Sequence, residues 1–226
     1  MSFELVAVEP DGPLYRLGRR PDPWAWPDWA YAGADGTFGN RYDDPAASYR
    51  VLYASSQRIG AFVETLARFR PDLAVLAELD QIEGDDESPA GVPREWLDTR
   101  MIGEAAVHGR FADVGDARSL AVLRTALAAG AIRYGLEEID AATIRLRAPR
   151  GFTQQLSRYV YEQRDEYGSA AGIRYRSRLG DELVNWAIFE PAVQAESPLR
   201  ATAAETIALD DGDLIAALDL LDLALV

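Results

Sequence analysis

The segment 40–66 holds the residue types best suited to chemistry in this chain. It reads NRYDDPAASYRVLYASSQRIGAFVETL and places Arg41, Arg50, Tyr53 and Glu64 within one expected strand-to-helix unit. Guanidinium groups bind phosphate oxygens in a bidentate manner. A crevice between a strand end and a helix face can hold such an anion beside a carboxylate. The pattern therefore predicts an anion-binding site with an acidic group next to it.

Two readings of the arginines in this segment stay open. Arg41 and Arg50 flank a turn that contains Asp43 and Asp44. Two guanidinium groups beside a strand end suit a pyrophosphate. Alternatively, both arginines form ordinary ion pairs with the two aspartates, since such pairs are common at protein surfaces.

Composition excludes several kinds of chemistry. The chain has no cysteine, and all 23 basic residues are arginine, so disulfides, thiolate chemistry, a Schiff-base lysine and a Walker-type lysine are absent. His108 is the single histidine, and it is expected to be structural rather than a general base. We expect no metal site, because the acidic segment 78–93 lacks the regular ligand spacing of a calcium loop and is predicted to be a surface loop.

The charge balance indicates which partners to expect. The net charge of −14 argues against binding to a nucleic-acid backbone, although arginines gather at 16–20, 41–70 and 174–178 and indicate a locally positive site. No run of 18 apolar residues occurs, and Glu4 and Glu9 interrupt the N-terminal segment. We therefore expect no membrane partner and a cytoplasmic location.

Hydrophobic periodicity predicts the elements that must position the site residues. Ser55 or Ser56 is expected to cap the central helix, and Asp116 to cap a later helix that ends at Gly130. The segment 183–189, LVNWAIF, is apolar on both faces, which favours a buried strand. Trp24, Trp26 and Trp29 either wall a pocket or pack an irregular segment onto the core. The predicted strands are 14–17, 50–55, part of 96–107, 173–177 and 183–189, and the other predicted helices are 59–66, 152–164 and 210–225.

Strands and helices alternate without a regular βαβ period, which predicts an α+β (mixed α/β) fold. We expect a single domain over 1–226 with a central twisted, largely mixed sheet flanked by helices. The recognisable core covers about 14–190, and the acidic helix 210–225 is expected as a C-terminal appendage to it. The amphipathic pattern of this helix favours packing against the core over docking of a partner.

Several ordered blocks resemble one known family. NRYDDP, YRVLYAS and FVETL are similar to the opening signature of the RES-domain family, which is named for a characteristic arginine, glutamate and serine. The resemblance continues through AAVHGRFADV, SLAVLR, GIRYRSR and NWAIFE, and so spans Leu14 to Glu190. One departure is that the family pattern has a Trp-Asn pair after the arginine, where this chain has Tyr42-Asp43.

The resemblance assigns roles by position. It implies that Arg41 is the family arginine and holds a phosphate, and that Tyr53 orients the nicotinamide side of the ligand. It implies that Glu64 is the family glutamate and stabilises positive charge on a ribose, and that Ser177 is the family serine and hydrogen-bonds the ribose or the amide. Arg16 and Glu190 are weaker matches. The expected catalytic residues are Glu64 and Ser177, and the expected substrate-binding residues are Arg41, Tyr53, Arg50 and Arg16.

Members of this family resemble ADP-ribosyltransferases in fold and consume NAD, commonly as toxins neutralised by an antitoxin. The resemblance implies an enzyme that cleaves the nicotinamide–ribose bond with water or phosphate as acceptor, with NAD as substrate and no further cofactor. It also implies an antitoxin as a candidate partner, and a homodimer is compatible with it. The alternatives are a non-catalytic module that binds a nucleotide or ADP-ribose, transfer of ADP-ribose to a macromolecule, and a structural role with surface ion pairs.

Overall fold

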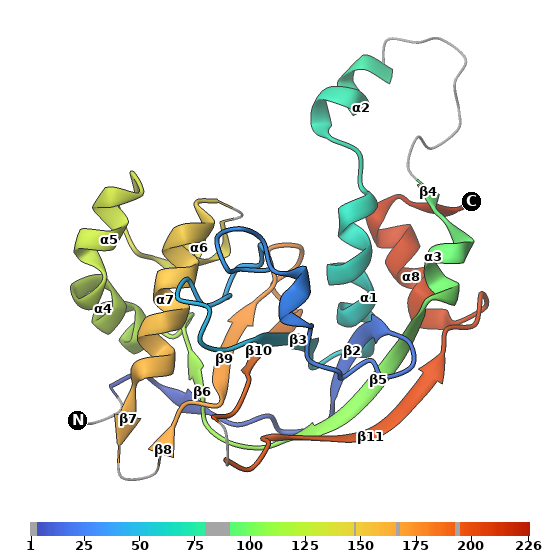
Figure 1. Ribbon diagram of the computed structural model, residues 1–226. Coiled ribbons are helices and arrows are strands. Elements are labelled where there is room, and N and C mark those ends of the chain that lie inside the picture. The colour runs from blue at the N-terminus through green and yellow to red at the C-terminus, as the bar shows by residue number, and fades with distance from the viewer. Residues whose placement is uncertain (1–3, 80–90, 147, 166–167, 193–194) are drawn as a thin grey trace.

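The protein is built on one curled, eight-stranded mixed sheet (Figure 1). The computed structural model describes residues 4–79, 91–146, 148–165, 168–192 and 195–226. Within these residues the strand order is β1-β6-β9-β10-β3-β2-β5-β11. Every neighbouring pair is antiparallel except β6 and β9, which run parallel. The predicted α+β class with a mixed central sheet is confirmed.

The strands are short near one edge of the sheet and long near the other. Two small additional sheets pair β12 with β4 in parallel and β7 with β8 antiparallel. The strand bounds are Ala7–Val8 (β1), Leu14–Arg19 (β2), Val51–Ser55 (β3), Gly91–Val92 (β4), Arg100–Val107 (β5), Phe111–Asp113 (β6), Arg164–Asp165 (β7), Gly168–Ser169 (β8), Gly172–Arg176 (β9), Val184–Phe189 (β10), Leu199–Thr206 (β11) and Ala224–Leu225 (β12).

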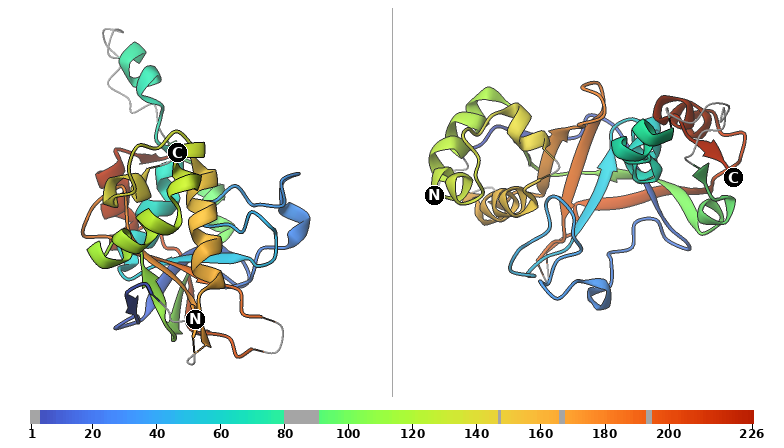
Figure 2. Two further views of the ribbon diagram at one scale, coloured as in Figure 1. Left: turned by 90° about the vertical axis from the view of Figure 1, so that its left-hand side faces the viewer. Right: turned by 90° about the horizontal axis from the view of Figure 1, so that it is seen from above.

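The helices form two groups above the sheet, α4 to α7 at one end and α1, α3 and α8 at the other, while α2 projects outward (Figures 1 and 2). None in the described part of the chain is long and apolar enough to cross a membrane. The α-helices are Arg58–Leu66 (α1), Leu73–Leu79 (α2), Arg94–Asp98 (α3), Ala117–Ala126 (α4), Ala128–Arg133 (α5), Ala141–Arg145 (α6), Arg150–Glu162 (α7) and Gly212–Leu221 (α8), and two 3-10 helices cover Trp29–Tyr31 (η1) and Ala67–Phe69 (η2).

The two central strands are buried on both faces, as predicted for 183–189. In β10, Ala187 and Phe189 pack against the helix group α4 to α7, whereas Trp186 and Ile188 belong to a separate core on the opposite face. Trp24 packs into this opposite core and is almost fully buried. The tryptophan-containing segment therefore covers the far face of the sheet.

The central strand-to-helix unit forms as predicted, with β3 followed directly by α1. Gly60 allows the close approach of the helix to the strand, because a Cβ at this position would lie 2.2 Å from Oγ of Ser55. Gln57 fixes the junction to β10, since its Oε1 accepts from N–H of Val184 at 3.1 Å. The expected serine cap is not used, and Gln57 occupies the N-cap position without a side-chain capping bond.

The C-terminal helix α8 packs in the core, as its amphipathic pattern favoured. Leu214, Ala217, Leu218 and Leu221 are buried and share one hydrophobic cluster with Phe62, Val63 and Leu66 of α1. Asp211 has two roles at the start of this helix. It caps α8, and its two carboxylate oxygens accept hydrogen bonds from Arg58 of α1 at 2.6 Å and 2.8 Å. Local sequence suggested an acidic outer face, but the apolar stripe of α8 determines its position.

The Arg58–Asp211 pair should make stability depend on pH. Hydrogen bonds from Arg58 hold the pKa of Asp211 below its usual range, so the pair stabilises the fold above the ordinary carboxyl pKa and the contribution disappears as pH falls through the lowered value. We expect Arg58→Met to reduce the free energy of unfolding by roughly 1–3 kcal/mol at pH 7. The difference from wild type should be smaller at pH 3 than at pH 7, as measured by urea titration.

Arg118→Met is the control for this comparison. Arg118 also pairs with an aspartate, but its side chain is 78% exposed, so little change is expected at either pH. An equal loss from Arg58→Met at both pH values would show that packing of the arginine, and not its charge, accounts for the effect.

Three other predictions about elements need correction or qualification. Asp116 caps α4 as expected, but the predicted helix is interrupted at Leu127 and continues as α5, which itself contains Gly130. No element was predicted for the segment directly after η2, which contains α2 (Leu73–Leu79). Most of the acidic segment 78–93 lies outside the described residues.

Candidate functional site

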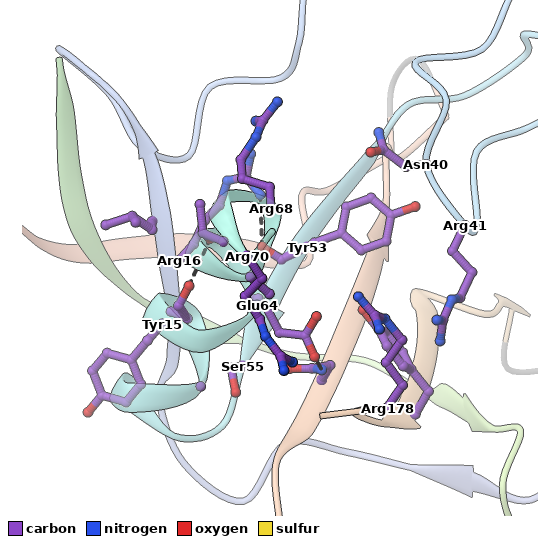
Figure 3. A pocket seen from close by; sticks show the side chains of 18 of the residues that line it. Tyr15, Arg16, Asn40, Arg41, Tyr53, Ser55, Glu64, Arg68, Arg70 and Arg178 are labelled. Carbon is purple, nitrogen blue, oxygen red and sulfur yellow. Dashed lines mark hydrogen bonds between the residues drawn. The ribbon is translucent and has the colours of Figure 1, made fainter. Parts of the chain in front are cut away.

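A cavity of about 900 Å³ lies between the two helix groups, with the sheet as its floor. One wall comes from α1 and the following residues up to Leu73, and the other from the Asn40–Arg41 loop, Arg150 at the start of α7 and Arg178 after β9. Figure 3 shows Glu64, Arg68 and Arg70 on one side and Arg41 and Arg178 on the other. The volume is in the range of small-molecule binding sites.

Strand register places a row of polar side chains across the cavity floor. Tyr15 of β2 pairs with Ser55 of β3, Ser55 pairs with Asn185 of β10, and Asn185 pairs with Tyr175 of β9. Directly paired residues point to the same face of a sheet. All four line the cavity, so segments separated by more than a hundred residues supply one continuous polar surface.

The Glu64 carboxylate is held in place through one of its two oxygens. Oε1 accepts hydrogen bonds from Oγ of Ser177 and from Nδ2 of Asn185, the latter at 2.7 Å. Oε2 has no partner among the described residues, and the Glu64 side chain lines the cavity. The arrangement gives an oriented carboxylate with one oxygen available to a ligand.

Ser177 supports Glu64 but does not line the cavity. Its side chain is almost fully buried at 1% exposure. Its Oγ donates to Glu64 and accepts from N–H of Leu179 at 2.9 Å. The structure thus brings the two predicted catalytic residues together, with Ser177 placed behind the carboxylate and engaged by protein groups on both sides.

The loop that carries Arg41 is organised by Asp43 and Tyr53. Oδ2 of Asp43 accepts from N–H of Phe38 at 2.9 Å and of Asn40 at 2.7 Å, and the Tyr53 hydroxyl accepts from N–H of Tyr42 at 2.9 Å. Burial raises the pKa of Asp43 and, well above its ordinary value, that of Tyr53. Tyr53 therefore remains protonated at neutral pH, and its ring lines the cavity while its hydroxyl positions the loop.

Arg41 presents its guanidinium group to the cavity beside an aromatic ring. Its Nη2 donates to the carbonyl oxygen of Arg145 at 3.0 Å, and its Cζ lies 5.7 Å from the centre of the Tyr175 ring. Burial raises the pKa of Tyr175 well above its ordinary value. Neither Asp43 nor Asp44 pairs with Arg41, because Asp43 binds backbone N–H groups and Asp44 pairs with Arg158 at 3.3 Å.

The cavity is strongly basic although the chain as a whole is acidic. Among the described residues, the cavity lining contains two carboxylates, Glu64 and Asp72, and six arginines: Arg16, Arg41, Arg68, Arg70, Arg150 and Arg178. Of these, the side chains of Arg68, Arg70, Arg150 and Arg178 have no hydrogen-bonded or ion-paired partner in the described ranges. Unpaired guanidinium groups around one space favour a ligand with several anionic oxygens.

Arg16 lies in the cavity wall as expected, but its guanidinium group is already occupied. Its Nε donates to the carbonyl oxygen of Pro23 at 2.9 Å, and its Nη1 donates to that of Tyr53 at 2.8 Å. Burial lowers the pKa of Arg16 to about 10, so it remains a cation at neutral pH. Arg16 therefore contributes charge to the site while it joins β2, the Pro23 loop and β3.

Arg50, which was predicted to bind substrate, lies apart from the cavity and has partners of its own. It does not line the cavity, and it forms a bidentate ion pair with Glu190, with Nε at 2.7 Å from Oε2. Its Nη1 also donates to the carbonyl oxygen of Pro27 at 3.0 Å. The pairing lowers the pKa of Glu190, so two residues considered for the site neutralise each other elsewhere.

Several residues that line the cavity were not predicted from the sequence. Arg68, Arg70 and Arg178 fall in the arginine-rich segments noted above, so their density was a usable signal. Asn185 is the polar residue in the otherwise apolar segment LVNWAIF, and this contrast was also a usable signal. Arg150 carried no signal. Among the described residues, no group of three or more histidine, aspartate or glutamate side chains could hold a metal ion, and Trp24, Trp26 and Trp29 do not line this cavity.

Comparisons with known proteins agree on the architecture. A family model described as RES domain matches residues 13–210. A chain in the crystal structure of the M. tuberculosis MbcT-MbcA toxin-antitoxin complex is similar in fold, with a TM-score of 0.54, 11% sequence identity, and coverage of 96% of this chain and 92% of that chain. No curated protein matches this sequence.

Proposed function

The chain belongs to the RES domain family, and on this basis we propose that it consumes NAD by cleaving the nicotinamide–ribose bond. The observation that carries the proposal is the oriented Glu64 carboxylate, whose Oε1 is held by Ser177 and Asn185 in a cavity that also contains Arg41. NAD combines an anionic pyrophosphate with a ribose that becomes positively charged as the bond breaks. The cavity offers groups for both.

Glu64, the arginines and the two tyrosines have different roles in the proposed reaction. As nicotinamide leaves with the bonding electron pair, positive charge develops on the ribose, and Glu64 stabilises this charge more strongly than it stabilises the bound substrate. Arg41 and the unpaired arginines bind the pyrophosphate oxygens. Tyr53 and Tyr175 remain protonated at neutral pH, so they line the site as neutral aromatic groups and do not act as bases.

An oxygen nucleophile then bonds to the ribose carbon that nicotinamide has left. With water the products are ADP-ribose, nicotinamide and a proton. With inorganic phosphate the products are nicotinamide and ADP-ribose that carries the phosphate on this carbon. Both acceptors are compatible with the site, because the surplus of arginines also suits an anionic acceptor.

Product analysis tests the proposal. We expect the purified protein to release nicotinamide from NAD, and mass spectrometry of reactions with and without phosphate to identify the acceptor. Saturable NAD binding with unchanged NAD would instead support a binding module. Label from NAD found on a protein or nucleic acid would support a transferase.

We further propose that the activity makes this chain the toxin of a toxin–antitoxin pair. Support comes from the family and from the similar fold found in a toxin–antitoxin complex. Inducible expression in cells, with Glu64→Gln as the inactive variant, tests this proposal.

A further inference from the structure

Asn185 is a buried polar residue that faces the cavity from an otherwise apolar strand. It lies in β10 with 2% exposure, between the register partners Ser55 and Tyr175. The other residues of this strand from Trp186 to Phe189 are buried apolar side chains. A polar amide at such a position requires partners for both of its ends.

One end of the amide is explained by Glu64. Nδ2 donates to Oε1 of Glu64 at 2.7 Å. This contact also fixes the orientation of the amide, because a rotated amide would place Oδ1 against a carboxylate oxygen, with no proton between two acceptors.

The other end of the amide has no partner. Oδ1 is buried and accepts no hydrogen bond from any described residue, while Asn185 lines the cavity. Leaving a buried acceptor unsatisfied is unfavourable, because the acceptor has lost its hydrogen bond to water without gaining another. A ligand that supplies a donor at this point would recover that cost, whereas phosphate oxygens would not, since they are acceptors at neutral pH.

Ser177 is not available for the same task. Its Oγ is engaged by Glu64 and by N–H of Leu179, and it does not line the cavity. The hydrogen bond to the ribose that was expected from Ser177 is therefore better assigned to a different residue. Asn185 is the group that both contacts Glu64 and keeps an acceptor for the ligand.

We propose that Oδ1 of Asn185 accepts a hydrogen bond from a ribose hydroxyl of the nicotinamide riboside half while Nδ2 orients Glu64. The inference rests on the proposed function, which places this ribose beside Glu64. A ribose hydroxyl becomes a stronger donor as positive charge develops on the sugar, so the bond to Oδ1 strengthens as the reaction proceeds. Asn185 thereby makes the site specific for a hydroxylated sugar.

Substrate analogues can separate the two roles of Asn185. We would measure kcat/KM for NAD and for analogues that lack the 2-hydroxyl or the 3-hydroxyl of the nicotinamide-bearing ribose, with wild type and with Asn185→Leu. For one of the two analogues, we expect the ratio of kcat/KM for NAD to kcat/KM for the analogue to be about tenfold higher in wild type than in Asn185→Leu. Poor orientation of Glu64 lowers the rate on every substrate and cancels in this ratio, as does the intrinsic reactivity of each analogue.

Ser177→Ala is the matched control, because it removes the other donor to Glu64 and leaves Oδ1 of Asn185 in place. It should lower activity on NAD and on the analogues alike and keep the wild-type ratio. Asn185→Ser serves as the second variant should the leucine variant not fold, as judged by circular dichroism. The inference is overturned when the Asn185 variants keep the wild-type ratio for both analogues, which would mean that water satisfies Oδ1.

A failure of the proposed function gives a different result. Wild type would then not release nicotinamide from NAD, and the same comparison would use dissociation constants of NAD and the analogues from calorimetry. A selectivity that depends on Asn185 would support recognition of the hydroxyl without turnover. Equal binding by wild type and variant, or no binding, would overturn the inference.

Discussion

Replacing Glu64 with glutamine is expected to lower kcat for nicotinamide release by about 10²- to 10³-fold while the dissociation constant of NAD changes little. Glutamine keeps an oxygen that can accept from Ser177 and Asn185, so the side chain can stay in place. It loses the negative charge that stabilises the ribose in the transition state. The measurement is nicotinamide release under saturating NAD, together with calorimetric titration of NAD into the variant.

Glu205→Gln provides the control for this variant, because Glu205 is an exposed glutamate of the edge strand β11 and does not line the cavity. It should retain wild-type turnover. In cells, inducible expression of wild type should lower NAD levels and slow growth, and Glu64→Gln should do neither. Full turnover by Glu64→Gln would remove this carboxylate from the mechanism, and growth arrest by that variant would separate toxicity from NAD cleavage.

Replacing Arg41 with alanine is expected to weaken NAD binding by roughly 10- to 100-fold, which corresponds to the loss of one or two charge-assisted hydrogen bonds. The loop itself should persist, because Asp43 binds N–H of Phe38 and Asn40 independently of the Arg41 side chain. Binding is best measured in the Glu64→Gln background, where turnover does not deplete the ligand. Arg41→Lys should recover part of the affinity, since it restores the charge but not the bidentate geometry.

Two arginines outside the cavity serve as comparisons for Arg41. Arg200→Ala removes an exposed arginine of β11 and should leave NAD affinity and stability unchanged. Arg50→Ala should also leave NAD affinity unchanged, although loss of the Glu190 pair should lower stability. Should Arg50→Ala weaken binding as much as Arg41→Ala, the effect would reflect general loss of positive charge and not a specific anion site.

The sequence predicted the local units of this protein well. The central strand, the helix after it and the order of Arg41, Tyr53 and Glu64 follow from residues close together in the chain, where β-branched content and helical spacing act over a few positions. The absence of cysteine and lysine restricted the chemistry without any structural information. The α+β class followed from the irregular alternation of predicted strands and helices, and the family followed from the ordered motifs.

Tertiary structure alone decided which of these residues share a site. Arg41 and Arg50 looked equivalent in sequence, but Arg50 meets Glu190, which is 140 residues away, at the end of the paired strand β10, whereas Arg41 meets no carboxylate among the described residues. Long guanidinium side chains bind whichever acceptor the fold brings within reach, and strand order fixes that acceptor. The same strand pairing places Asn185 beside Ser55 and close to Glu64. This placement could not be predicted, because the register between distant segments depends on global packing and leaves no trace in local periodicity.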